Sequence, residues 1–337
     1  MRRFGWFGSI LVAGLAVLAG TAAASLVPRG RIHYVDVPTV QLSLRGSTVP
    51  GRSGDASGIA MLAAREPARE IGLPAPVDAA LVETAAVGTL PRIAADGRTS
   101  LRQYAHPSAP GCDRPCVGLI ITGLGLATEL TTRALALPAL VGLSFSPYAD
   151  AAGWQARARR QGHEVLLDLP LQPARYPQDD SGPLTVAPSA AGLQPALMRA
   201  LAAGSGYVAL VADAGAFAGD TQAFVPLARM LHERGLGFVE LGGSALAQPA
   251  RAEHLPYVTA SGPIDPDVTD EASDRALAGI EAAALQGGAA LVFARPTPLG
   301  LDRLAAWLET LPTKGLLLAP PSRLLERAGS PQTLAGE

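Results

Sequence analysis

Three carboxylates and one guanidinium are the side chains of this chain that could do chemistry together. Asp168, Asp213 and Glu240 each end a short apolar run, and Arg295 follows the run 290–294. If these runs are parallel strands, their carboxyl ends meet on one face and bring the four groups together. Converging carboxylates can act as general acid and base, or hold a hard cation through oxygen ligands. The structural alternative is that they pair with Arg295, with one another or with backbone amides of the loops.

Three hydroxyl side chains stand near the same expected strand ends. Thr122 and Gly123 follow the first apolar run, and Ser144 and Ser146 lie near the end of the second. With Arg295 they are the candidate substrate-binding residues. Gly123-Leu-Gly125 resembles a phosphate-binding turn, but it lacks a third glycine at the right offset, and a tight turn after a strand explains it equally well.

The histidines do not form a metal site in this sequence. They are His33, His106, His163, His232 and His254. His163 opens an expected strand at the end opposite the candidate site, which favours a packing or capping role for its side chain. No two are spaced to bind a metal from one element, so the sequence predicts no histidine-based zinc hydrolase.

Composition narrows the classes of function. The chain has 337 residues, is 48% hydrophobic and 17% charged, and carries a formal net charge of −2. This balance gives no electrostatic reason to expect a nucleic-acid partner. The aromatic content of 5% argues mildly against an extended polysaccharide groove. The length allows one large barrel plus an extension.

Short apolar runs alternate with helical segments from Val117 onward. The expected strands are 117–122, 141–145, 164–169, 207–212, 236–240, 256–260, 290–294 and 315–319. The expected helices are 126–136, 150–161, 193–203, 221–234, 270–287 and 299–310. Continuous apolar runs are typical of parallel strands covered by helices on both faces. The alternation predicts a closed or nearly closed βα barrel, with a doubly wound open sheet as the alternative.

The N-terminus carries a targeting segment. Arg2 and Arg3 precede an uncharged, largely apolar run at 4–27, longer than the about 20 residues that cross a bilayer. The small residues at 21–25 also suit a signal peptidase. Residues 1–27 are therefore a signal anchor or a cleaved signal peptide. Both alternatives place the remainder on the periplasmic side of the inner membrane, or free in the periplasm.

Residues 28–104 are expected to be a low-complexity, flexible tether. A short helix is predicted from Pro76 to Val87, where proline suits a first turn and Gly88 an end. The Asp96-Gly97 pair predicts a hairpin over 90–104, packed on the barrel. Residues 330–337 are expected to be a tail.

Cys112 and Cys116 are the only cysteines, in Cys-Asp-Arg-Pro-Cys. In an oxidising compartment they could close a small loop just before the first barrel strand. A zinc site is the weaker alternative, because no histidine pair lies nearby to complete four ligands. Two reduced thiols would be expected only if the protein stayed in a reducing compartment.

Ordered segments of the chain resemble the divergent polysaccharide deacetylases, an envelope-associated branch of the polysaccharide deacetylase superfamily. The matching segments include Ile-Ile-Thr-Gly-Leu-Gly-Leu (120–126) and Gly-His-Glu-Val-Leu-Leu-Asp-Leu-Pro-Leu-Gln-Pro (162–173). Other matches are at 90–99, 143–149, 176–177, 182–185 and 206–216. The resemblance implies an irregular (β/α)7-type, NodB-like barrel over 105–329. It also implies an ancestral reaction, the metal-assisted hydrolysis of an acetyl group on a sugar.

The chain departs from the family pattern where that reaction needs its ligands. Thr122-Gly123 replaces an Asp-Asp pair, and Asp168 and Asp213 stand where active relatives often carry histidine. Glu240 corresponds to an aspartate, and Ala294-Arg295-Pro296 to a Gly-His-Pro segment. The resemblance therefore implies a deacetylase-like scaffold without the usual metal ligands.

Two functions follow as hypotheses. In the first, metal-dependent catalysis is lost or altered, no cofactor is expected, and the barrel binds a cell-envelope glycan or an envelope protein. In the second, the chain is an active N- or O-acetyl deacetylase. Asp168, Asp213 and Glu240 then hold a divalent cation such as Mg²⁺ or Mn²⁺.

Overall fold

The computed structural model describes residues 73, 77–107, 112–179, 182–264 and 270–328. The expected signal anchor or signal peptide at 1–27 and the tail at 330–337 lie outside these residues. So does most of the tether. Within the described part of the chain, no helix combines the length and apolar character needed to cross a membrane.

Seven parallel strands form a closed ring. In ring order they are β3 (Cys116–Leu124), β4 (Gly142–Phe145), β5 (Val165–Asp168), β6 (Ala209–Asp213), β7 (Gly237–Leu241), β8 (Tyr257–Ile264) and β9 (Ala289–Ala294). The ring closes because β9 pairs with β3 along Cys116–Ile121. The two-residue strand β10 (Leu317–Leu318) pairs with the start of β3. The predicted barrel is confirmed, and the β3–β9 pairing excludes the open-sheet alternative.

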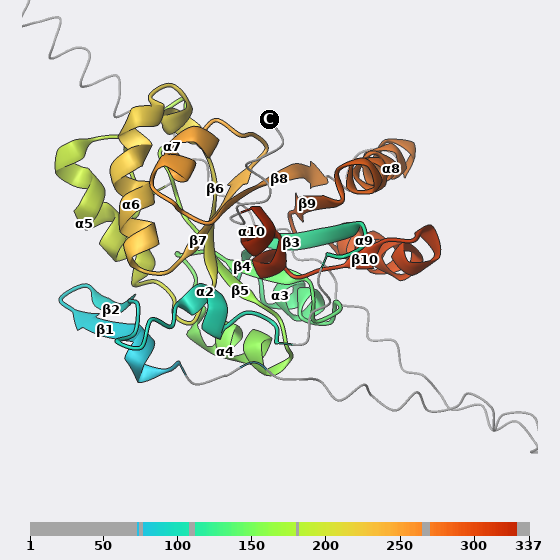
Figure 1. Cartoon of the computed structure of the whole chain (residues 1–337), viewed down its shortest axis with the longest axis horizontal. Helices are drawn as coiled ribbons and strands as arrows, with labels where there is room; N and C mark the ends of the chain where they lie inside the picture. Colours follow the sequence, from blue (N-terminus) through green and yellow to red (C-terminus); the bar gives the residue numbers. More distant parts are fainter. Residues whose placement is uncertain (1–72, 74–76, 108–111, 180–181, 265–269, 329–337) are drawn as a thin grey trace, which may run out of the picture. The chain divides into compact units, whose positions relative to one another are not determined.

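Helices follow the strands around the outside of the ring (Figure 1). They are α3 (Thr128–Ala134), α4 (Ala152–Arg160), α5 (Ala190–Leu201), α6 (Val225–Glu233), α7 (Ala247–Ala252), α8 (Asp270–Gly287) and α9 (Pro298–Thr310). Local sequence explains several boundaries. For example, Thr297 caps α9 by accepting a hydrogen bond from Gly300 N, and Pro298 occupies the first turn. The side chains of α8 and α9 are linked by Trp307 Nε1, which donates to Glu281 at 2.8 Å.

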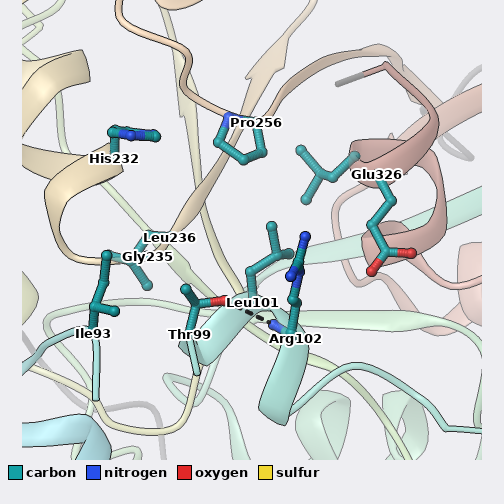
Figure 2. A pocket seen from close by; sticks show the side chains of 10 residues that line it. Ile93, Thr99, Leu101, Arg102, His232, Gly235, Leu236, Pro256 and Glu326 are labelled. Carbon is teal, nitrogen blue, oxygen red and sulfur yellow. Dashed lines mark hydrogen bonds between the residues drawn. The ribbon is translucent and has the colours of Figure 1, made fainter. Parts of the chain in front are cut away.

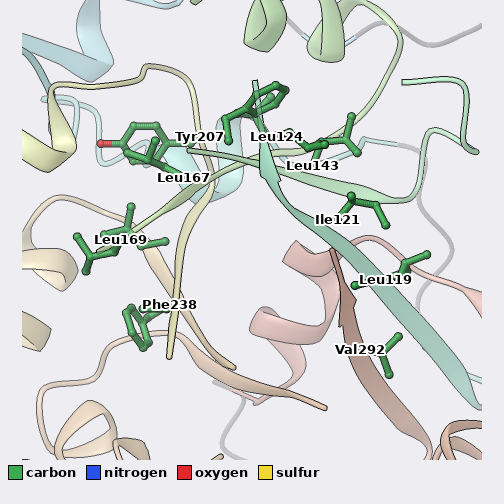
Figure 3. Close-up of a cluster of buried hydrophobic side chains, with 14 of the residues drawn as sticks. Leu119, Ile121, Leu124, Leu143, Leu167, Leu169, Tyr207, Phe238 and Val292 are labelled. Carbon is green, nitrogen blue, oxygen red and sulfur yellow. The ribbon is translucent and has the colours of Figure 1, made fainter. Parts of the chain in front are cut away.

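Alternate strand residues build two apolar layers. Leu119, Ile121, Leu167 and Phe238 belong to the outer layer, which packs against the helices (Figure 3). The residues between them, such as Ile120, Leu166 and Val239, belong to a second cluster inside the ring. This period of two follows from the pleat of a strand. It decides which polar residues at the strand ends point into the barrel.

The helix α10 (Pro321–Ala328) closes the amino end of the barrel, which we call the floor. Its Leu324 and Leu325 are buried with the inner cluster. Glycines on the strands leave room for it. A Cβ at Gly237 would lie 2.8 Å from Leu325 Cδ1, and one at Gly142 would lie 2.5 Å from Pro321 Cγ. Larger residues at these two positions would push the helix away.

The segment before the barrel differs from the prediction. The expected helix at 76–87 is wrong: a single 3₁₀ turn, Ala79–Leu81, leads into β1 (Val82–Ala85), which pairs with β2 (Gly88–Pro91). Asp78 accepts a hydrogen bond from Ala80 N and caps only that turn.

The Asp96-Gly97 turn is present, but the two extended arms predicted around it are not. Gly97 N donates to Ala94 O, and the chain then enters α2 (Ser100–Gln103). Thr99 accepts from Arg102 N, so the second arm becomes a capped helix. The segment contacts the barrel, as predicted, because Leu101 N donates to Gly235 O.

Cys112 and Cys116 form a disulfide, as the first of the three alternatives predicted. The bond closes a loop directly before β3. Arg327 of α10 donates to the carbonyl of Cys112 at 3.1 Å, which ties this loop to the floor of the barrel.

Candidate functional site

A cavity of about 370 Å³ lies at the carboxyl ends of the strands. We call it the mouth. Its lining residues are Thr122, Gly123, Asp168, Leu169, Val211, Ala212, Asp213, Leu241, Arg295 and Pro296. The structure therefore brings together four of the predicted site residues, contributed by β3, β5, β6 and the turn after β9. Working sites of parallel barrels are built at this end.

Asp168 is held on the inner wall by two hydrogen bonds. Its Oδ1 accepts from Ser144 Oγ, and its Oδ2 accepts from Gly123 N at 2.8 Å. Ser144 is fully buried, so this predicted substrate-binding residue serves to hold Asp168. Burial raises the pKa of the Asp168 carboxyl, and the hydrogen bonds from Ser144 and Gly123 offset part of that rise.

We expect Asp168→Asn to fold and to remove a pH dependence of stability. An asparagine can still accept from Gly123 N, and its amide can donate to the Ser144 hydroxyl. Because the folded pKa of Asp168 is raised, the native protein loses stability as pH rises above the ordinary value of 3.8. Urea unfolding across this range should therefore show an advantage of Asp168→Asn that grows with pH. An advantage that shrinks with pH would contradict the assignment.

Asp213 ends β6 and is exposed to solvent at the mouth. Its Oδ1 accepts a hydrogen bond from Gly215 N at 2.8 Å, which closes a tight turn. Gly215 is required there, since its φ is +52° and a Cβ would lie 2.2 Å from Gln172 O. Among the described residues, no group hydrogen-bonds the second carboxylate oxygen of Asp213. That oxygen can accept a donor from a ligand.

Arg295 and Thr122 complete the polar lining. Thr122 is buried, and its Oγ1 donates weakly to Ala294 O at 3.4 Å. Arg295 is exposed, and its guanidinium forms no hydrogen bond or ion pair within the described ranges. Pairing of the carboxylates with Arg295 was one structural alternative that the sequence allowed. The structure does not show this pairing among the described residues.

Glu240 does not reach the mouth, which corrects its prediction as a site residue. On β7, Val239 and Leu241 belong with the inner cluster, so Glu240 points to the outer face. Its Oε1 accepts from Ala245 N and its Oε2 from Leu246 N, both at 2.8 Å. The Oε2 also accepts from Tyr257 Oη at 2.6 Å, and the residue is 1% exposed. This carboxylate holds the loop between β7 and α7.

Ser146 and the histidines are also outside the mouth. Ser146 Oγ accepts from Tyr148 N at 3.3 Å, which fixes the loop after β4. His163 is buried, with Nδ1 2.9 Å from Val141 O, so its predicted packing role is confirmed. His232 and His254 lie on the surface, and His106 is buried near the barrel floor. His33 is not among the described residues.

The donors at the mouth do not fit a catalytic metal. A resident cation needs several ligand atoms that converge on one point. Of the three predicted carboxylates, only Asp168 and Asp213 line the mouth, and Glu240 points to the other face. In the described part of the chain, no group of three His, Cys, Asp or Glu side chains could hold an ion. No reaction step through a metal can be derived from this arrangement.

Four large apolar side chains at this end of the barrel were missed by sequence reasoning. Leu126, Tyr148, Tyr176 and Leu299 are 65%, 42%, 50% and 52% exposed. They follow β3, β4, β5 and β9, which are consecutive neighbours in the ring. We call this arc the apolar rim. None of the four lines the mouth, but large exposed apolar side chains that follow neighbouring strands at one end of a barrel form a candidate contact surface. The sequence gives no sign that these four, among many apolar residues, are exposed.

A larger cavity, of about 580 Å³, lies at the opposite end of the barrel (Figure 2). Leu236 and Pro256, directly before β7 and β8, form one side, and Leu101 of α2 forms another. Its lining is mainly apolar, with Arg102, His232 and Glu326 at the edge. Binding groups of parallel barrels come from the loops at the carboxyl ends, so the mouth remains the candidate site.

Comparisons with known proteins agree with the geometry. The family model of the divergent polysaccharide deacetylases matches residues 119–325. The crystal structure of uncharacterized protein ATU2773 from Agrobacterium tumefaciens C58 is 30% identical and has a TM-score of 0.65. That match covers 70% of this chain and 99% of the other.

A second structure, of protein EF3048 from Enterococcus faecalis V583, is 9% identical with a TM-score of 0.44. It covers 64% of this chain and 99% of that one, and is too distant to inform the site. No curated protein matches the chain.

Proposed function

Because the chain belongs to the divergent polysaccharide deacetylase family, we propose that it binds a glycan of the cell envelope at the mouth without metal-dependent hydrolysis. The family membership indicates a carbohydrate-related function. The proposal adds that the ancestral hydrolysis of acetyl groups has been lost, while the ability of the mouth to bind a sugar has been kept.

The commitment of the carboxylates to the protein's own backbone carries this proposal. Gly123 occupies a position at which the resemblance implies an acidic side chain in active relatives, and its N–H donates to Asp168. Glu240 is used in the same way by Ala245 N and Leu246 N. A carboxylate that satisfies backbone donors cannot leave them without a cost of about 1–3 kcal/mol for each donor left unpaired.

The polar groups left uncommitted at the mouth suit a sugar. Asp213 offers an acceptor and Arg295 several donors, and both are accessible to solvent. At the same end of the barrel, the loops after β4 and β5 carry the exposed rings of Tyr148 and Tyr176, which provide flat apolar surfaces. A few polar groups beside an apolar surface are typical of ligand sites. The opposite choice, an envelope protein seated on the rim, is an outcome that the binding test below distinguishes.

We also propose that the barrel works on the periplasmic side of the inner membrane, or free in the periplasm. The disulfide between Cys112 and Cys116 supports this placement, because disulfides persist in oxidising compartments. The apolar pattern at 1–27 supports export of the chain. No cofactor and no nucleic-acid partner are expected.

The proposal predicts glycan binding that does not depend on metal. With full-length protein, acetylated chito-oligosaccharide should bind equally well after chelation and after addition of Zn²⁺, Mn²⁺, Mg²⁺ or Ca²⁺. These ions should not shift the melting temperature, and no acetate should be released. Asp213→Ala should weaken binding about tenfold, because a ligand hydrogen bond to a charged group is lost. Calorimetry and an acetate assay measure both quantities.

Asp220→Ala is the matched control. Asp220 is also exposed and also accepts a backbone hydrogen bond, from Ala223 N at 3.3 Å, but it does not line the mouth. Binding should survive its loss. Metal-dependent acetate release that Asp213→Ala abolishes would restore the active-deacetylase alternative. Binding of an envelope protein, but of no oligosaccharide, would replace the glycan by a protein partner.

A further inference from the structure

We infer that the glycan bound at the mouth carries a carboxylate, which Arg295 binds while a hydroxyl, amide or amine of the same sugar donates to Asp213. This inference rests on the proposed function, because it names the class of sugar that the same site selects. The inference is based on the three charged side chains that line the mouth, Asp168, Asp213 and Arg295. Within the described residues, Asp168 accepts hydrogen bonds at both oxygens, Asp213 accepts at one, and Arg295 makes none.

The two aspartates and the arginine share one cavity without pairing. No ion pair joins Arg295 to Asp168 or Asp213, although other arginines of the described barrel do find carboxylates, as Arg229 does with Glu253 at 2.9 Å. Asp213 ends β6, whereas Arg295 follows β9, and β7 and β8 lie between them in the ring. Positive and negative charge are therefore held on separate walls. A ligand that spans the mouth meets an acceptor on one side and a cation on the other.

The turn that carries Arg295 is short and stiff. Pro296 follows it directly, and Pro298 begins α9 in a turn capped by Thr297. Proline fixes φ near −65° and so restricts the backbone on the C-terminal side of Arg295. On the other side, β9 pairs with β3 up to Ala294. The guanidinium is thus presented from a backbone whose position is set before a ligand arrives, which lowers the entropic cost of binding.

The chemistry of the guanidinium selects the anion. Its planar fork donates two parallel hydrogen bonds to a carboxylate or a phosphate, and a neutral hydroxyl cannot use both. Asp168 is already held by the chain itself, because its two oxygens accept hydrogen bonds from Ser144 Oγ and Gly123 N. Asp213, exposed and with one oxygen uncommitted to described residues, then orients the sugar by accepting from its donor groups. An acidic sugar can therefore accept hydrogen bonds from Arg295 through its carboxylate and donate one to Asp213 at the same time.

The test compares two forms of one sugar. Full-length protein is titrated with a uronic-acid disaccharide and with its methyl ester, in which a neutral ester replaces the negatively charged carboxylate. The acid should bind at least about tenfold more tightly than the ester. Arg295→Gln should remove this preference and leave the ester unaffected. Arg295→Lys should restore part of it, since lysine supplies the charge without the planar fork.

Arg175→Gln is the control, because Arg175 is exposed on the loop after β5, pairs with Asp179 at 2.8 Å, and does not line the mouth. The preference for the acid should persist in this variant. Equal binding of acid and ester to the native protein, or a preference that survives Arg295→Gln, overturns the inference and leaves the proposed function standing. Inorganic phosphate or acetate binding as tightly as the disaccharide would also overturn it, since the sugar would then contribute nothing. If neither disaccharide nor any neutral oligosaccharide binds, the proposed function fails as well.

Discussion

Glu164→Ala is expected to lower the free energy of unfolding by about 4 kcal/mol. Glu164 is fully buried at the amino end of β5, and its carboxylate accepts from His106 N and Ser322 N, each at 2.9 Å, and from the Ser322 hydroxyl. Alanine leaves two buried backbone donors without an acceptor, at about 1–3 kcal/mol each, and opens a cavity. Urea unfolding at neutral pH measures the loss.

The loss should be concentrated in the floor of the barrel. Ser322 lies in the first turn of α10, so the Glu164 carboxyl also caps the amino end of that helix by accepting from Ser322 N and Ser322 Oγ. In Glu164→Ala, the packing of Leu324 and Leu325 against the inner cluster should weaken. The backbone amides of α10 should then exchange their hydrogens faster than the amides of the strands do. Glu164→Gln should lose less than alanine, because one amide oxygen can satisfy one of the two backbone donors.

Glu309→Ala is the control for this variant. Glu309 is exposed on α9 and has no hydrogen-bond partner among the described residues, so its loss should change stability by no more than about 0.5 kcal/mol. If Glu164→Ala unfolds at the same urea concentration as Glu309→Ala, the buried carboxylate does not hold the floor.

Glu240→Ala is expected to cost about 3 kcal/mol of stability. It removes the acceptor for Leu246 N, which is buried, and for Ala245 N and the Tyr257 hydroxyl, which can turn to water. The loop between β7 and α7 should loosen first, and calorimetric melting together with amide exchange at Leu246 measures both effects. Glycan binding should remain within about twofold of native, because Glu240 is not at the mouth.

This variant also separates the two functional hypotheses. In a rebuilt cation site, Glu240→Ala would abolish cation binding along with activity and leave most of the stability. Glu233→Ala, an exposed glutamate of α6, is the control and should be nearly neutral in both measurements. Full stability of Glu240→Ala combined with a lost cation would show that Glu240 contributes to the site after all.

The sequence predicted the barrel well because each buried strand and each covering helix leaves a local trace. An apolar run such as Val117–Ile121 ends in glycine or a polar residue, and this is visible without knowledge of its partners. The strands of the ring and its helices other than α7 were placed within a few residues of the observed ones, and the short helix α7 (Ala247–Ala252) was not among the expected helices. The error before the barrel has a local cause: at Asp78, Thr99 and Val82–Ala85, capping groups and pairing choose between helix and strand, and neither choice is fixed by the residues alone.

The candidate site was predicted less well, for a reason that Glu240 illustrates. In a strand covered on both faces, every neighbour is apolar, so Gly237–Leu241 has no alternation that would show which face Glu240 belongs to. Ser144 and Asp168 likewise meet only because Ser144 is registered with Leu166 on the neighbouring strand. A shift of one residue in this register would place the two side chains on opposite faces of the sheet.

What the sequence determined by itself is the order of strands and helices, the family resemblance and the absence of the usual histidine and aspartate ligands, since these depend on residue type and local pattern. Tertiary structure alone decided which of the polar groups share a cavity. Strand register committed Asp168 to Ser144 and Gly123, sent Glu240 to the outer face, and left Asp213 and Arg295 on opposite walls. Register and closure of the ring are set by contacts between residues far apart in the chain, and such contacts leave no mark on any single segment.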